Sequence, residues 1–192
     1  MLLLLAGLLL FLGLHSLSII NSRWREVAIA RVGETPYQAG FGLLALAGLV
    51  MIIYGYGAAR GSATPLMLYD PPTWLRHLSL LLMLPVFPLL FAAYMPGRIQ
   101  AVTRHPMLLA VKLWAVAHLL ANGMLWDLLL FGGFLAWAVA DRISLKYRTP
   151  LPVSGAPPGR YNDLIAVALG LGLYVAFLLV LHRWLMGVAP IG

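Results

Sequence analysis

The sequence predicts an all-α fold, a polytopic membrane helical bundle with about six transmembrane helices, in one domain over residues 1–192. Of its 192 residues, 62% are hydrophobic and 10% are charged, and the mean hydropathy is +0.91. Soluble domains carry about 25% charged residues. Because a spanning helix needs about 20 apolar residues, the apolar part of the chain suffices for about six. This composition excludes a soluble domain and a disordered chain.

Six apolar stretches match this estimate. The first lacks the basic start and the cleavage site of a secretory signal, so we expect a retained helix, and the second has no charge. The third contains Pro85 and Pro88, which predict a kink because proline removes a helical hydrogen bond. The fourth starts at Pro106 and ends at an Asn122-Gly123 turn, and a polar linker, 142–161, separates the last two. The predicted spans are 2–20, 39–59, 74–94, 106–121, 125–140 and 162–181.

The basic residues predict how this bundle is oriented. With six spans, loops 21–38, 95–105 and 142–161 share one side and hold nine of the 13 Lys and Arg residues. Cytoplasmic loops are enriched in Lys and Arg, so both termini are expected outside a bacterial inner membrane. The net charge of +7 comes largely from basic residues in these loops, next to the bilayer surface. We therefore do not interpret it as a sign of nucleic-acid binding.

Two histidines lie deep in predicted spans and are the candidate metal ligands. The chain has no cysteine, which excludes iron–sulfur clusters, zinc–thiolate sites and a thiol nucleophile. His15 lies in the first span, and His118 lies about 20 Å along the fourth from His105. Each could bond a neighbouring carbonyl, or the two imidazoles could hold a haem iron from both faces. On straight helices their depths differ by about 8 Å, which helix tilt could close.

Two cations near the fourth span are candidate partners of an anionic group. Lys112 lies on the cytoplasmic side of His118 and can extend to the interface, pair with a carboxylate or meet a cofactor propionate. Arg104 precedes the predicted helix start at His105 and can face lipid headgroups or bind an anion at the positive helix end.

The remaining polar groups near span ends receive simpler interpretations. Asp127 and Asp141 bound the fifth span, and we expect them to anchor it at the interface or to pair with Arg104 or Arg142. Headgroup-level positions are expected for two histidines that each neighbour an arginine, His77 and His182.

Several motifs together resemble the NnrU family of membrane proteins. They are Arg104-His105-Pro106 followed by WAVAHLLANG over 114–123, with Leu14-His15-Ser16 and Asp141-Arg142. The resemblance extends from residue 1 to about residue 185. This family is similar to plant and cyanobacterial 15-cis-zeta-carotene isomerase, a membrane haem b protein with two histidine ligands. The resemblance implies a haem b iron held by His15 and His118, with Arg104 and Lys112 as expected propionate partners.

The resemblance also implies function. NnrU proteins are linked to denitrification, so we expect a bis-histidine haem protein connected with nitrite and nitric oxide metabolism or with isomerase-like redox chemistry. Its ligand would be an apolar polyene or a nitrogen oxide. The isomerase has a cysteine where this chain has Ala115, so a thiolate ligand is excluded here.

Three alternatives remain open. The first is a polyene cis–trans isomerase, and the second is a non-catalytic subunit that assists reductase assembly. The third is a membrane methyltransferase, because the Arg-His-Pro element also resembles the isoprenylcysteine carboxyl methyltransferases. That family has a later acidic residue, whereas residues 146–160 and 164–192 of this chain contain no Asp or Glu.

Overall fold

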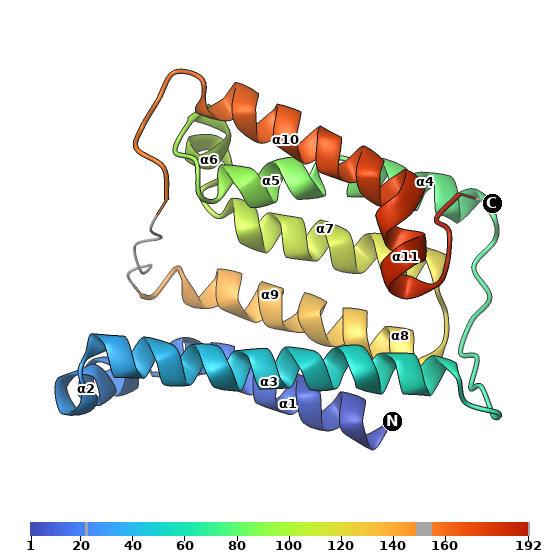
Figure 1. Cartoon of the computed structure of the whole chain (residues 1–192), viewed down its shortest axis with the longest axis horizontal. Helices are drawn as coiled ribbons and strands as arrows, with labels where there is room; N and C mark the ends of the chain where they lie inside the picture. The colour runs from blue at the N-terminus through green and yellow to red at the C-terminus, as the bar shows by residue number, and fades with distance from the viewer. Residues whose placement is uncertain (22, 149–154, 192) are drawn as a thin grey trace. The chain divides into compact units, whose positions relative to one another are not determined.

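In a computed structural model that describes residues 1–21, 23–148 and 155–191, every predicted span coincides with helix (Figure 1). Two short helices, α2 (Arg23–Val32) and α6 (Arg98–Thr103), occupy predicted loops. The spans correspond to α1 (Leu2–Ile20), α3 (Glu34–Arg60), α4 (Trp74–Met83) with α5 (Val86–Ala92), α7 (Pro106–Ala121), α8 (Leu125–Asp127) with η1 (Leu128–Gly132) and α9 (Gly133–Ser144), and α10 (Asn162–Ala176) with η2 (Phe177–Leu181) and α11 (His182–Met186).

The hydropathy of these helices supports a membrane bundle. In the described part of the chain, four helical segments are long and apolar enough to cross a bilayer: Leu2–Ile20, Glu34–Arg60, Trp74–Ala92 and Asn162–Met186. α7 is also apolar but has 16 residues, fewer than the usual span. The membrane helical class is therefore supported, and the number of six spans stays a prediction.

Helix boundaries differ from the predicted ones where polar residues continue a helix. The second span begins at Glu34 instead of residue 39, directly after Gly33, whose φ of 88° interrupts the helix.

The prolines act as the sequence predicts. The break between α4 and α5 falls at Pro85, which confirms the kink predicted in the third span. Helix α7 begins at Pro106, as predicted, with His105 at the N-cap.

The predicted linker 142–161 starts with helix. α9 continues to Ser144, whose hydroxyl donates to the Asp141 carbonyl oxygen at 2.8 Å, and Arg148 forms an ion pair with the Asp141 carboxylate. Of the two expected roles of Asp141, the ion pair with Arg104 or Arg142 is wrong: among the described residues the partner is Arg148, which lies seven residues, about two helical turns, further along the chain. Residues 149–154 of the linker lie outside the described residues.

The chain divides into two compact units, each built from two separate stretches of sequence. The first unit contains Met1–Asp70 and Gly123–Thr149, and the second contains Pro71–Asn122 and Pro150–Gly192. The predicted Asn122-Gly123 turn thus marks a boundary between the units.

In the first unit, α1 and α3 lie side by side along most of α1 (Figure 1). Glycines on both helices allow this approach, as small residues do in membrane helix pairs. A Cβ added at Gly55 would overlap the backbone of Leu4, whose Cα atom would be 2.7 Å away. A Cβ at Gly7 would lie 2.7 Å from the backbone nitrogen of Ile52. This helix pair can therefore exist only without side chains at these points.

We expect Gly55→Ala to destabilise the protein, because backbone and not a flexible side chain opposes the new methyl group. Overpacking costs about 1–3 kcal/mol, which lowers the unfolding midpoint of a chain of this size by roughly 2–12 °C. Thermal unfolding in detergent, followed by far-UV circular dichroism, measures the shift. Gly57→Ala is the matched control on the same helix, since an added Cβ there meets nothing within 4 Å. Equal midpoints for the two variants would contradict the close packing.

In the second unit, α5 contacts both α7 and α10, and Val86, Leu89 and Ala110 form a buried core between α5 and α7. The start of α10 is fixed by two side chains. The Asp163 carboxylate accepts hydrogen bonds from the backbone N–H groups of Arg98 and Ile99, at 2.8 and 3.1 Å, at the start of α6. The Asn162 amide donates to the Pro96 carbonyl oxygen at 2.8 Å. The two bonds to Asp163 satisfy terminal N–H groups of α6, and together with the Asn162 bond they join the start of α10 to the start of α6.

Candidate functional site: an imidazole-lined cavity

His118 is held in one tautomer by its own helix, α7. Its Nδ1 atom lies 2.8 Å from the carbonyl oxygen of Trp114, one turn earlier. A carbonyl oxygen only accepts hydrogen bonds, so Nδ1 carries the hydrogen. In the neutral ring the lone pair is then on Nε2, the atom that binds metals or accepts protons.

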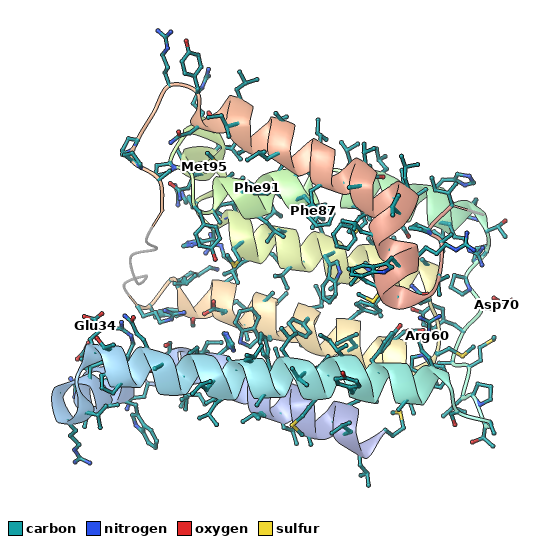
Figure 2. The ribbon with its side chains drawn as sticks, viewed as in Figure 1. Glu34, Arg60, Asp70, Phe87, Phe91 and Met95 are labelled. Atoms are coloured by element: carbon teal, nitrogen blue, oxygen red, sulfur yellow. The ribbon has the colours of Figure 1, made fainter. Side chains whose placement is uncertain are left out.

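His118 lines a cavity of about 250 Å³ within the second unit. Side chains from α4, α7, α10 and α11 contribute polar groups to its wall, and several apolar residues complete it. The polar residues are Arg76, Ser79, His118, Asn122, Tyr174 and His182, and the apolar ones include Leu80, Met83, Phe87, Phe177 and Leu178. Figure 2 labels Phe87, which projects from α5 toward α10; its ring centroid lies 5.0 Å from that of Phe177.

The C-terminal segment forms one side of this cavity. Gly187, with a φ of 72°, ends α11 in the left-handed conformation that glycine adopts without strain. The chain then turns back (Figure 1), so that Val188, Ala189 and Pro190 line the cavity. The carbonyl oxygen of Val188 lies 2.7 Å from Nδ1 of His182, which therefore also carries its hydrogen on Nδ1.

His15 lies in the first unit, on α1, and has the same arrangement. Its Nδ1 atom is 2.7 Å from the Phe11 carbonyl oxygen, and three aromatic rings surround the imidazole. Ring centroids lie 4.3 Å away for Phe11, 5.2 Å for Phe41 and 6.0 Å for Trp137. The Nε1 atom of Trp137 is buried and has no hydrogen-bond partner among the described residues. An unsatisfied buried donor costs free energy, so this environment suits a ligand with an acceptor group.

The structure brings together only part of the predicted set. His118 and the two predicted cations all belong to the second unit, but Lys112, which is half-buried, and Arg104, which is exposed, are not among the cavity-lining residues. The cation in the wall is Arg76. His15 belongs to the first unit and His118 to the second, so the two predicted axial ligands lie in different units.

Sequence reasoning missed most of the cavity wall. His182 was expected at headgroup level beside Arg183, yet it is half-buried and lines the cavity. Ser79, which is 7% exposed, and Tyr174 were not singled out. Polar residues inside apolar spans are a usable signal for such positions, because lipid-facing surfaces disfavour them.

Asp127 differs from its expected surroundings. It is 3% exposed, and its carboxylate accepts hydrogen bonds from the Tyr56 hydroxyl at 2.6 Å and from the Met124 backbone N–H at 3.0 Å. The expectation of an interface anchor or a pair with Arg104 or Arg142 is therefore corrected: Asp127 joins α8 to α3 inside the first unit.

Tyr69, which lies outside the membrane helices, is also affected by Asp127. The pKa of its phenol is raised, mainly by burial and to a smaller extent by the nearby Asp127 charge.

Within the described residues there is no cluster of three or more His, Cys, Asp or Glu side chains that could hold a metal ion. Such a cluster would be needed for a metal ion whose ligands all come from protein side chains. A haem iron takes four ligands from the porphyrin and needs only one or two from the protein.

The fold and the cavity define the chain as an all-helical protein of membrane type with an imidazole-lined cavity in its second unit. It belongs to the NnrU family: the family model described as "NnrU protein" matches residues 3–190, nearly the whole chain. This match confirms the resemblance found in the sequence. Comparison with curated proteins and comparison with solved structures each returned no match.

Proposed function

We propose that the protein is an integral membrane haem b protein of the bacterial inner membrane, with His15 and His118 as axial ligands. The observation that carries the proposal is that each imidazole lies within an apolar helix, where a polar ring is costly, and has the tautomer that a metal ligand needs. Each Nδ1 atom is bonded to a carbonyl oxygen one turn earlier, which puts the lone pair on Nε2. Fixed tautomers of this kind are common for histidines that bind metals.

The surroundings of each histidine also suit a haem. Aromatic rings around His15 offer apolar contact to a porphyrin, and the buried Trp137 Nε1 is a donor that a ligand could satisfy. Next to His118, the Trp114 ring offers apolar contact as well, with its centroid 5.3 Å from that of the imidazole. Arg104 and Lys112 stay proposed propionate partners from the sequence. When bound, a haem with two histidine ligands supplies one-electron transfer, and nitrite or nitric oxide metabolism is the proposed setting.

The proposed topology has six spans with both termini outside. The predicted cytoplasmic loop 21–38 contains helix α2. This helix has no buried residue and carries Arg23, Arg25 and Arg31. A basic polar helix of this kind fits a position at an anionic cytoplasmic membrane surface.

The absorption spectrum of detergent-purified protein, expressed with an adequate haem supply, tests the haem proposal. We expect a Soret band with about one haem per chain, and its loss or a clear spectral shift in His15→Ala and in His118→Ala. The control is His77→Ala, because His77 is exposed on α4 and is not a cavity-lining residue. Colourless wild-type protein that elutes as a folded species, or unchanged spectra in both ligand variants, would overturn the proposal.

A further inference from the structure

Three neutral polar side chains in the wall of the second unit's cavity, those of Tyr174, Ser79 and His182, have already used their hydrogens and present acceptors. The Tyr174 hydroxyl donates to the Leu80 carbonyl oxygen at 3.0 Å, and the Ser79 hydroxyl donates to the Leu75 carbonyl oxygen at 2.9 Å. His182 uses its Nδ1 hydrogen on the Val188 carbonyl oxygen. Each group therefore retains acceptor capacity only: the Oη of Tyr174, the Oγ of Ser79 and the Nε2 of His182.

A ligand that binds to these three groups must accordingly bring its own donor hydrogens. Arg76 adds a positive charge to the wall, which disfavours a cation and can donate to an oxygen of the ligand. A hydroxyl group meets both requirements, because its hydrogen can be donated to an acceptor while its oxygen accepts from the guanidinium.

The apolar part of the wall indicates the body of the ligand. Phe87 and Phe177, with ring planes inclined by 34°, lie beside Met83, Leu80 and Leu178. Aromatic and methionine side chains of this kind favour a flat apolar ring. The volume of about 250 Å³ is below the roughly 300–1,000 Å³ typical of sites for drug-sized ligands, so a single ring fits better than a long chain.

We propose that this cavity is a binding site for a hydroxylated aromatic ring of the hydroquinone class, with His182, Tyr174 and Ser79 as acceptors and Arg76 as the donor. The inference goes beyond the proposed haem function and stands without it, because no step of it uses an iron. In a membrane setting, such a ring would arrive as the head group of a lipid-soluble molecule.

Calorimetric titration of the detergent-purified full chain with trimethylhydroquinone tests the proposal. Anaerobic conditions with excess dithionite keep both the ligand and any haem reduced, so that the heat reports binding. The dimethyl ether of the same ring is the control ligand, since it has the same shape without donor hydrogens. We expect it to bind at least about tenfold more weakly, the factor that one lost hydrogen bond of about 1.4 kcal/mol produces.

Variants assign the acceptor. We expect His182→Leu to weaken hydroquinone binding about tenfold, His182→Gln to retain most of it, and His77→Leu to leave it unchanged. Ser79→Ala and Tyr174→Phe provide the same test if His182→Leu fails to fold. Equal affinity for the hydroquinone and its ether, or wild-type affinity in all folded acceptor variants, would overturn the proposal. A missing Soret band would not affect this test, so failure of the haem proposal is recognised separately.

Discussion

Gly170→Ala is expected to lower the unfolding midpoint of the protein by roughly 5–15 °C. Gly170 on α10 faces the backbone of Pro88 on α5, and an added Cβ would lie 2.5 Å from the Pro88 Cα and 2.6 Å from its Cδ. No flexible side chain can move aside there, because the proline ring is fixed within α5. The two helices must separate and lose the packing between them, at a cost of about 2–4 kcal/mol.

Thermal unfolding in detergent provides the measurement, with Gly172→Ala as the matched control. Gly172 lies two residues further along α10, and an added Cβ there meets nothing within 4 Å. Alanine is favoured over glycine in a helix by about 1 kcal/mol, so the control should match or exceed the wild-type midpoint. A Gly170→Ala protein as stable as the Gly172→Ala protein would show that α5 and α10 do not approach each other in this way.

Asp127→Ala is expected to have an effect of similar size in the first unit. The substitution leaves the Tyr56 hydroxyl and the Met124 backbone N–H without the acceptor that both use, in a position that is 3% exposed. Each unsatisfied buried group costs about 1–3 kcal/mol, so we expect the unfolding midpoint to fall by roughly 5–15 °C.

A double-mutant cycle with Tyr56→Phe separates this effect from simple loss of volume. Removing the hydroxyl alone should cost about 1 kcal/mol in the wild type, and should cost nothing or be stabilising in the Asp127→Ala background, where the hydroxyl has lost its acceptor. Asp127→Asn, which keeps one acceptor oxygen, should lie between wild type and Asp127→Ala. Additive effects of the two substitutions would contradict the hydrogen bond between them.

The helices could be predicted from sequence because the hydrophobic runs are long and their ends are chemically marked. The predicted first and fourth spans, 2–20 and 106–121, coincide with α1 and α7. The start of α7 at Pro106 and the break at Pro85 could also be predicted, because proline favours the first turn of a helix and interrupts a helix interior wherever it occurs. The errors fell at Glu34 and Ser144, where polar residues extend helices. Gln38 donates to the Glu34 carboxylate and Arg148 donates to the Ser144 hydroxyl, and such bonds favour helix despite the low hydropathy.

The candidate site could be predicted only in part. His118 was found because a deep imidazole is costly in lipid, a property of one residue. Its neighbours Arg76, Tyr174 and His182 come from three other helices, and only tertiary packing brings them to one cavity. The same applies to Trp137 beside His15, and to Asp127, whose partner Tyr56 is distant in the sequence.

The interleaved composition of the two units has a consequence for biosynthesis. The first unit takes its residues from 1–70 and from 123–149, and the intervening stretch belongs to the second, which also needs the C-terminal residues. As the nascent chain leaves the ribosome, α1 and α3 can pair early but must wait for α9, while α4 to α7 must wait for α10. Neither unit can be completed from one half of the gene product. A ribosome stalled near residue 122 would therefore expose two unfinished helix groups to chaperones and proteases.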